Sequence, residues 1–275
     1  MIRRVLLCPP TYFEVRDVKN PYMKDGAAID HAKAQQQWEA LRSALKSSGV
    51  EVETIDPVKD LEDMVFSANQ VFVGYHPRLG NFIVPSEMRH VSRQREVPYY
   101  VDWFRRRGYY VMSLNLYGEC LEGHGDLLWQ PDRSKIWAGY GFRSTERAIG
   151  KFSEAMAQLD IPVISLRLMD ENFYHLDTSL CPLNDDAALI YAGAFSTEAV
   201  AKLRRGWKRI HELTREEASQ FMGNGVVAGG KYITPRITDN LERILAHENL
   251  QPVVVETSEF EKSGGSLFCM KCVLA

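Results

Sequence analysis

Two of the five cysteines lie in a polar cluster near the end of the chain, residues 264–272. Cys269 follows a Gly-Gly turn there, and a cysteine on such an exposed edge can act as a nucleophile. With Cys272 it also forms a Cys-x-x-Cys pair, which is typical of half a zinc site or of a redox pair. A zinc site needs further ligands at paired spacing, which the sequence does not offer. Residues three apart in a strand face opposite ways, so a redox pair is disfavoured.

A histidine and a carboxylate lie close together in a second cluster, residues 173–178. If this stretch is a strand, His175 and Asp177 point to the same face. A histidine beside a carboxylate is a ready general acid or base, because the carboxylate stabilises its charged form. A structural histidine with satisfied hydrogen bonds fits this stretch about equally well.

A third cluster, residues 122–126, places Glu122, His124 and Asp126 among glycines, just before an apolar stretch. Glycines permit tight turns and close approach of a ligand, but a plain polar turn fits as well. One histidine and two acids do not define a metal-ligand set. The glycine-rich residues 223–230 lack the strand-then-helix setting of a phosphate loop, so we expect two strands joined by a glycine turn.

The composition is that of an ordinary globular domain, with 25% charged and 45% hydrophobic residues in 275. The formal net charge of −3 does not indicate a surface that binds nucleic acid. No apolar run approaches the roughly 20 residues that a bilayer requires, and the N-terminal apolar run is too short for a signal peptide. An odd number of cysteines without framework spacing predicts free thiols and a cytoplasmic location.

A pattern of strand, strand, amphipathic helix and short strand recurs about every 50 residues, five times in all. Strands are expected at residues 64–66, where the second unit begins, and at 266–274. Helices are expected at residues 31–47, 98–107, 145–159 and 239–247. Five such units build a propeller, but an ordinary open α/β sheet has the same alternation, and the pattern alone leaves both open. No low-complexity linker divides the chain, which predicts a single domain, residues 1–275.

Taken together, the motifs resemble the guanidine-modifying superfamily, which includes arginine deiminases, dimethylarginine dimethylaminohydrolases, amidinotransferases and arginine dihydrolases. The resemblance covers nearly the whole chain and rests on residues 8–13, 20–23, 63–69, 122–126, 137–144, 173–178 and 264–270. The family fold is a five-bladed α/β propeller, the pentein fold, with pseudo-fivefold ββαβ repeats and a central site. The resemblance therefore implies that fold here.

The resemblance also assigns roles around a planar guanidinium cation. Glu122 and Asp177 would bind it, with support from Asp126. Cys269 would attack the guanidino carbon, and the substrate cation would help to ionise the thiol. His175 would protonate the departing amine and then activate water against a thiouronium intermediate. Neither a cofactor nor a metal ion is implied.

Two asparagines narrow the range of substrates that the resemblance implies. Deiminases carry a carboxylate at the position of Asn69, whereas arginine dihydrolases carry asparagine there and at the position of Asn20. An amide suits a neutral ureido group, so the resemblance favours hydrolysis of arginine past citrulline to ornithine, ammonia and carbon dioxide. Gln70 departs from the small residues that usually follow in dihydrolases. Arg143, and next Arg93, are the candidates for binding the α-carboxylate, although a surface ion pair explains Arg93 about equally well.

Other functions remain open. A dimethylarginine dimethylaminohydrolase or an arginine deiminase would yield citrulline, and an amidinotransferase would pass the amidino group to an amine. A non-catalytic propeller would have no need for Cys269, His175 and Glu122 together. The expected partner is a small guanidino compound, with no nucleic acid or membrane, and a homo-oligomer is possible. Residues 13–30 suit either a mobile lid or a fixed surface loop.

Overall fold

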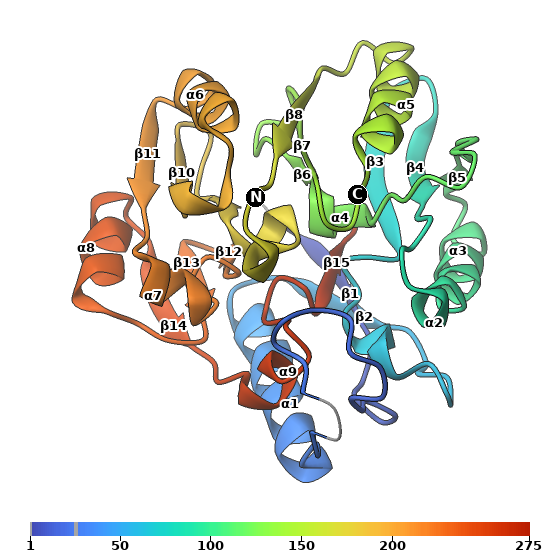
Figure 1. Ribbon diagram of the computed structural model, residues 1–275. Helices are drawn as coiled ribbons and strands as arrows, with labels where there is room; N and C mark the ends of the chain where they lie inside the picture. Colours follow the sequence, from blue (N-terminus) through green and yellow to red (C-terminus); the bar gives the residue numbers. More distant parts are fainter. Residues whose placement is uncertain (1, 25–26) are drawn as a thin grey trace.

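Five three-stranded sheets stand around a common centre in the computed structural model, which describes residues 2–24 and 27–275 (Figure 1). The sheets are β15–β1–β2 (Lys271–Val273, Arg4–Leu7, Glu51–Thr54), β3–β4–β5 (Val71–His76, Gly80–Pro85, Tyr110–Val111), β6–β7–β8 (Leu127–Trp129, Ile136–Tyr140, Val163–Arg167), β9–β10–β11 (Leu180–Pro182, Ala187–Ile190, Arg209–Glu212) and β12–β13–β14 (Val226–Ala228, Lys231–Thr234, Gln251–Val254). In every sheet the middle strand pairs antiparallel on one side and parallel on the other.

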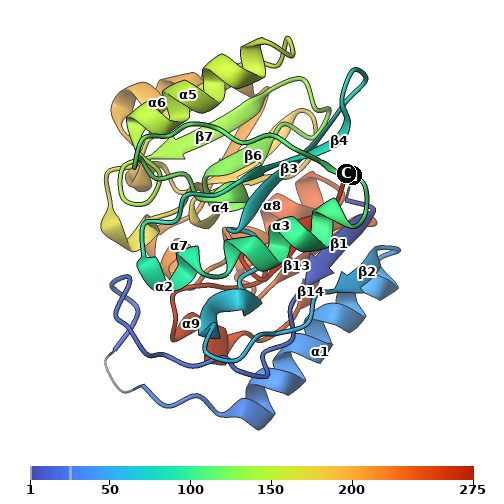
Figure 2. The same ribbon diagram turned by 90° about the vertical axis from the view of Figure 1, so that its right-hand side faces the viewer.

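One long helix per unit makes the crossover between the two parallel strands, and these helices form the outer rim (Figure 1). They are α1 (His31–Ser47), α3 (Val97–Arg105), α5 (Glu146–Ala157), α6 (Thr197–Gly206) and α8 (Asp239–His247). The short helices are α2 (Val91–Gln94), α4 (Gly123–Asp126), α7 (Arg215–Ser219) and α9 (Ser258–Glu261), with 3₁₀ turns η1 (Glu62–Val65), η2 (Glu171–Phe173), η3 (Leu176–Thr178) and η4 (Ala192–Ala194). Seen from the side, α2, α7 and α9 lie on one side of the ring and both termini on the other (Figure 2).

Helix α1 illustrates how the sequence forms a helix of the outer rim and packs it against the sheets. The side chain of Asp30 accepts a hydrogen bond from the backbone N–H of Lys33 and begins the helix. Gly49, with a φ of 78°, allows the chain to turn away after it. Trp38 and Leu41 lie on the buried face, where the core cluster also includes strands β1 and β12. Apolar periodicity and caps thus place one amphipathic helix against the sheets.

The first and last strands close the ring, because β1 and β15 pair antiparallel in one sheet with Val5 opposite Val273. Four buried clusters fill the spaces between neighbouring sheets, and no single sheet spans the molecule. The five-bladed propeller is therefore confirmed and the open sheet is excluded. None of the helices in the described ranges is long and apolar enough to cross a membrane.

Several local predictions can be compared with the structure. The helices expected at residues 31–47 and 239–247 are present with those bounds, and Gly229 and Gly230 join β12 to β13 as expected. The strand expected at residues 64–66 is wrong, since this segment belongs to η1 and the turn after it. The conditional strand at residues 173–178 is also wrong, because η2 and η3 occupy it. The five cysteines are free thiols.

Candidate active site

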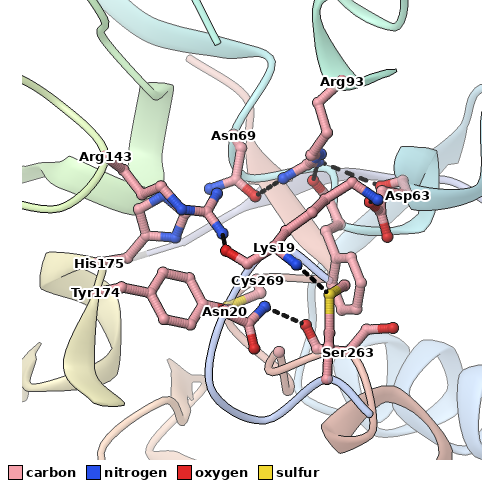
Figure 3. A pocket seen from close by; sticks show the side chains of 13 residues that line it. Lys19, Asn20, Asp63, Asn69, Arg93, Arg143, Tyr174, His175, Ser263 and Cys269 are labelled. Atoms are coloured by element: carbon pink, nitrogen blue, oxygen red, sulfur yellow. Dashed lines mark hydrogen bonds and ion pairs between the residues drawn. The ribbon is translucent and has the colours of Figure 1, made fainter. Parts of the chain in front are cut away.

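One pocket gathers six of the nine site residues expected from the sequence (Figure 3). Its lining is Lys19, Asn20, Met23, Asp63, Phe66, Asn69, Arg93, Arg143, Tyr174, His175, Ser263, Gly265 and Cys269. Glu122, Asp126 and Asp177 are buried and are not among the lining residues, but Glu122 contacts His175 and Asp177 contacts Cys269. These residues come from segments far apart in the sequence, brought together by the ends of the blades.

Cys269 lies in the turn before β15, not in a strand, and its side chain is buried. Its Sγ donates to Asp177 Oδ2 at 3.3 Å. Burial, and next the charge of Asp177, raise the pKa of the Cys269 thiol well above its ordinary value. Gly265 lines the pocket beside it, and a Cβ there would overlap the ring of Phe66. The free protein therefore holds Cys269 as a thiol beside a carboxylate.

His175 is held by Glu122, whose Oε2 lies 2.8 Å from His175 Nε2. The same Oε2 accepts from Arg143 Nη1 at 3.1 Å, and Oε1 accepts from the backbone N–H of Arg89. Burial raises the pKa of Glu122, but Arg143 and His175 outweigh it and hold that pKa well below its usual range. Glu122 is therefore a carboxylate that can stabilise an imidazolium at His175.

Asp126 supports the backbone around the histidine. Its Oδ2 accepts from the hydroxyl of Ser144 at 2.6 Å, and its Oδ1 accepts from the backbone N–H of Leu176 at 3.1 Å. Burial raises its pKa. His124, in the same short helix, is not available as a metal ligand, because both ring nitrogens contact the backbone, of Val73 and Leu127.

Asp177 carries one carboxylate oxygen without a hydrogen-bond partner. Its Oδ2 accepts from Cys269, whereas Oδ1 is buried and unpartnered among the residues that the structure describes. Burial, opposed by His175, raises the pKa of Asp177 to about 6. A buried acceptor of this kind is ready to bind an N–H donor next to the thiol.

Asn69 presents a donor. Its Oδ1 accepts from Arg93 Nη1 at 2.9 Å, and because a guanidinium can only donate, this bond fixes the orientation of the amide (Figure 3). Its Nδ2 has no partner within the described part of the chain. A Cβ at Gly125 would overlap Nδ2 and would lie 3.2 Å from the ring of His175, so Nδ2 lies near the histidine.

Two arginines of the pocket lie beside these groups, since Arg93 donates to Asn69 and Arg143 shares Glu122 Oε2 with His175. Arg143 Nη2 donates to the backbone carbonyl of Lys19 at 3.0 Å, and its guanidinium lies 4.6 Å from the centre of the Tyr174 ring. Arg93 is paired with Glu96 at 3.1 Å. Arg93 is 4% exposed, so the interpretation as a surface ion pair is wrong.

Asn20 joins the N-terminal segment to the loop before the cysteine. Its Nδ2 donates to the carbonyl of Ser263 at 2.9 Å, and its Oδ1 accepts from the backbone N–H of Tyr22. Gly264, with a φ of 77°, permits this contact, because a Cβ there would meet the Asn20 side chain at 2.5 Å. Both groups of the amide are thus already engaged in holding the loop.

Sequence reasoning missed Lys19 and Asp63, whose Nζ and Oδ2 are 3.1 Å apart at the pocket wall. Asp63 Oδ1 is buried and finds no partner in residues 2–24 and 27–275. Lys19 lies directly before the motif at residues 20–23, and Asp63 is the first residue of the motif at residues 63–69. A position in or directly beside a motif was therefore the available signal.

Comparison with known proteins places this geometry in a family. The family model described as N,N dimethylarginine dimethylhydrolase, eukaryotic, matches residues 9–274. The N(G),N(G)-dimethylarginine dimethylaminohydrolase of Mycobacterium tuberculosis is 35% identical over 267 residues, 97% of this chain and 84% of that protein. The bifunctional arginine dihydrolase/ornithine cyclodeaminase AgrE of Nostoc is 35% identical over 270 residues, 97% of this chain, which spans 37% of the length of AgrE.

Solved structures agree with the sequence matches. The N-terminal domain of ArgZ, an arginine dihydrolase of cyanobacteria, solved as a cysteine-to-serine variant bound to substrate, has a TM-score of 0.90 at 32% identity, over 98% of this chain and 97% of that one. An asparagine-to-serine variant of the same domain, covalently bound to a reaction intermediate, has a TM-score of 0.91 at 33% identity, over 99% and 97%. The chain belongs to the dimethylarginine dimethylhydrolase family.

Proposed function

We propose that this chain is a cysteine hydrolase of the guanidino group, and that it converts arginine to ornithine, ammonia and carbon dioxide. The observation that carries the proposal is the juxtaposition of Cys269, His175 and the free Nδ2 donor of Asn69 in one pocket. Relatives named as arginine dihydrolases and as dimethylarginine dimethylaminohydrolases support this class of substrate.

The charged part of the pocket would bind the amino-acid end of the substrate. Arg143 and Arg93 line it and carry the positive charge that an α-carboxylate requires. Asp63 Oδ1 is an unpartnered acceptor suited to the α-ammonium group, since Lys19 occupies only Oδ2. This arrangement would fix the distance from the amino-acid end to the thiol.

The first hydrolysis would begin when a guanidinium N–H donates to Asp177 Oδ1. The positive charge of the substrate then favours the thiolate of Cys269, which the free protein disfavours, and the thiol proton would pass to His175. Sγ bonds to the guanidino carbon, His175 gives its proton to the departing nitrogen, and ammonia leaves. His175, supported by Glu122, would next take a proton from water as the water attacks the thiouronium carbon. The C–S bond breaks, citrulline forms and the thiol is restored.

The second hydrolysis would use Asn69. Citrulline carries a neutral ureido oxygen, which needs a donor, and Nδ2 of Asn69 offers one near His175. A carboxylate at this position would repel that oxygen. Citrulline would therefore be held for a second attack by Cys269 on the ureido carbon, in which His175 gives a proton to the departing nitrogen and ammonia leaves. Water would then break the C–S bond of the thiocarbamate, and the carbamic acid released would break down to ornithine and carbon dioxide.

A substrate panel of arginine, methylarginines, citrulline and agmatine tests the proposal, with ammonia, citrulline and ornithine all measured. We expect arginine to give ornithine and two equivalents of ammonia, and citrulline itself to be consumed. Citrulline that accumulates without ornithine would exclude dihydrolysis. A clear preference for methylated arginine would assign dimethylarginine hydrolysis instead, and a new guanidine formed with an added amine would assign amidino transfer.

The five free thiols support a cytoplasmic location as part of this proposal. Cell fractionation with an antibody against the chain tests it. Recovery in a disulfide-forming compartment would contradict it.

A further inference from the structure

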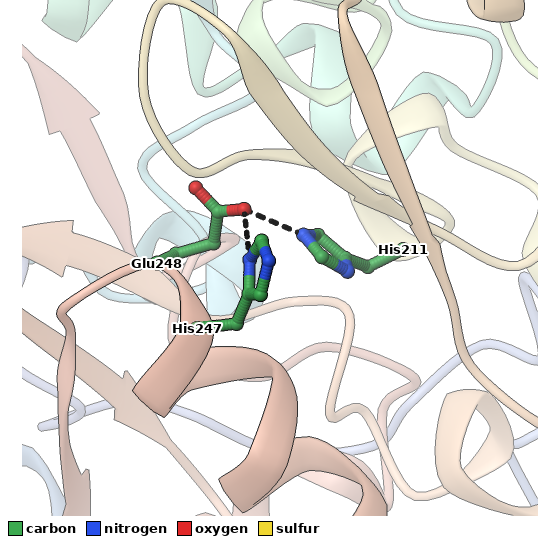
Figure 4. A group of neighbouring side chains, drawn as sticks. All are labelled: His211, His247 and Glu248. Atoms are coloured by element: carbon green, nitrogen blue, oxygen red, sulfur yellow. Dashed lines mark hydrogen bonds and ion pairs between the residues drawn. The ribbon is translucent and has the colours of Figure 1, made fainter.

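Three potential metal ligands meet outside the catalytic pocket, at His211, His247 and Glu248 (Figure 4). His211 lies on β11, His247 is the last residue of α8, and Glu248 caps that helix. None of the three lines the catalytic pocket. Because β11 belongs to the fourth sheet and α8 to the fifth unit, the cluster joins two neighbouring blades.

The ligand atoms of the cluster converge on one point. Glu248 Oε1 lies 2.7 Å from His211 Nε2 and 3.1 Å from His247 Nδ1, and all three atoms lie within 4.8 Å of one another. A tetrahedral zinc ion with bonds of about 2.0–2.1 Å separates its ligand atoms by about 3.3 Å. To reach that separation, the distance from Glu248 Oε1 to His211 Nε2 would open by about 0.6 Å and the distance to His247 Nδ1 by about 0.2 Å.

The oxygen at the centre of the cluster has more donors than lone pairs. Oε1 of Glu248 lies within hydrogen-bond distance of His211, of His247 and of Arg209 Nε, the last at 2.8 Å. A carboxylate oxygen offers about two lone pairs. A metal ion that replaced the two imidazole protons would leave this oxygen with two partners, the ion and Arg209.

Two neighbouring side chains already orient the carboxylate of Glu248. Arg209 Nη2 and Asn184 Nδ2 both donate to Glu248 Oε2 at 2.8 Å, and the Glu248 side chain is 2% exposed. Such contacts to a ligand hold it in position for a metal. The positive charge of Arg209 opposes a divalent cation, so we expect moderate affinity. The His247 side chain is 62% exposed, which admits a water molecule as fourth ligand.

We propose that His211 Nε2, His247 Nδ1 and Glu248 Oε1 form a zinc site that links the fourth and fifth blades. Two imidazoles and one carboxylate are a ligand set that zinc accepts, with water in the fourth position. An ion that binds only the folded chain stabilises it. The site is independent of catalysis, and its role is to hold two blades together.

Zinc titration of the full chain tests the site, in the Cys269→Ser background so that the catalytic thiolate does not bind the metal. We expect one equivalent of Zn²⁺ to bind in the micromolar range and to raise the midpoint of thermal unfolding by several degrees. Co²⁺ should give visible bands of a nitrogen- and oxygen-ligated ion. Absence of binding in this background would overturn the proposal.

Two variants assign the ligands. His211→Gln and His247→Gln keep an N–H donor for Glu248 but remove the imidazole, so each should bind Zn²⁺ at least ten-fold more weakly. Their unfolding midpoints without zinc should stay close to that of the parent, which shows that the blades are intact. His31→Gln, an exposed histidine on α1, is the matched control and should bind as the parent does. Unchanged affinity in either His211→Gln or His247→Gln would overturn the site as described.

Discussion

The side chain of Asn69 has one end fixed and one end free. Arg93 donates to Oδ1, whereas Nδ2 is a buried donor without a partner among the described residues. In Asn69→Asp the pair with Arg93 survives, but the donor is lost and a negative charge faces the ureido oxygen. The loss of a hydrogen bond of about 1–3 kcal/mol corresponds to a fall of about 5- to 150-fold in the rate of citrulline hydrolysis.

The measurement for Asn69→Asp is the ratio of citrulline to ornithine during arginine turnover. Citrulline should accumulate in the variant, whereas Asn81→Asp, on β4 outside the pocket, should keep the parental ratio. A variant that still releases ornithine in the parental ratio would remove Asn69 from the second hydrolysis.

Lys271 is a buried cation two residues after the nucleophile. Its Nζ lies 3.3 Å from the centre of the Phe268 ring and has no hydrogen-bond partner within the described ranges. Burial lowers its pKa from 10.5 to about 8. At pH 7 the ammonium is charged in both states, so the folded state bears a penalty of about 3 kcal/mol. Lys271→Met, of similar shape, should therefore raise the free energy of unfolding at pH 7.

The stability gained in Lys271→Met should fall as the pH rises. Between about pH 8 and 10.5 Lys271 is neutral in the folded chain but still charged in the unfolded chain, so the parent recovers stability and the gap to the variant narrows. Urea unfolding at pH 7 and pH 10 measures both values, with Lys59→Met, an exposed lysine, as control. If the difference in free energy of unfolding between Lys271→Met and the parent grew with pH, the buried charge of Lys271 would not be the cause of the destabilisation.

Lys271 should also affect catalysis through Asp177. The pKa of Asp177 is raised to about 6 mainly by burial, and Lys271 is among the charges that lower it. Since an ionised Asp177 is required to bind a cationic substrate, kcat/KM should rise with pH through this ionisation. In Lys271→Met the acid limb of the kcat/KM profile should move to higher pH. An acid limb that stays in place would show that Lys271 does not act on Asp177.

At the scale of elements, the four-residue helix α4 sets the distance between the amide and the imidazole. Gly125 in α4 has no room for a Cβ, which would overlap Asn69 Nδ2 and crowd the His175 ring. Gly125→Ala should therefore lower kcat/KM by about 100-fold or more, as misplacement of reacting groups by about 1 Å does. Steady-state kinetics measure this effect.

Gly150→Ala on α5 is the matched control, because nothing lies within 4 Å of a Cβ placed there. It should leave activity unchanged and stabilise the helix by about 0.5–1 kcal/mol. Equal activity of Gly125→Ala and Gly150→Ala would show that α4 does not position the site.

The long helices could be predicted from the sequence because their apolar positions repeat over several turns and most begin at a capping side chain, as α1 does at Asp30. The segments that carry the site residues were harder to predict from the sequence. Turns η1, η2 and η3 span three or four residues, too few for a period, and their apolar residues imitate a strand. The pair of Lys19 and Asp63 joins positions 44 apart, and only the folded ring brings them together.

At the scale of the whole molecule, the pairing of the first and last strands closes the ring of five sheets. The first strand, β1, lies between β2 and the last strand, β15, so both ends of the chain complete one blade. Cys269 lies two residues before the start of β15, so the position of the nucleophile depends on this closure. The backbone N–H of Leu274 donates to the carbonyl of Arg4 at 3.0 Å, which shows how near the two ends lie.

A circular permutant tests whether closure depends on pairing or on where the chain begins. A short flexible linker, about four residues, can join Ala275 to Met1 as a hairpin, because β15 and β1 are antiparallel neighbours. New ends between Asp132 and Arg133 fall in the exposed turn that joins β6 to β7. We expect cooperative unfolding and arginine turnover close to that of the parent. A second permutant opened between Gly123 and His124, inside buried α4, should lose activity. If the first permutant also lost its cooperative unfolding, the order of the blades along the chain, and not the pairing of β1 with β15, would control closure of the ring.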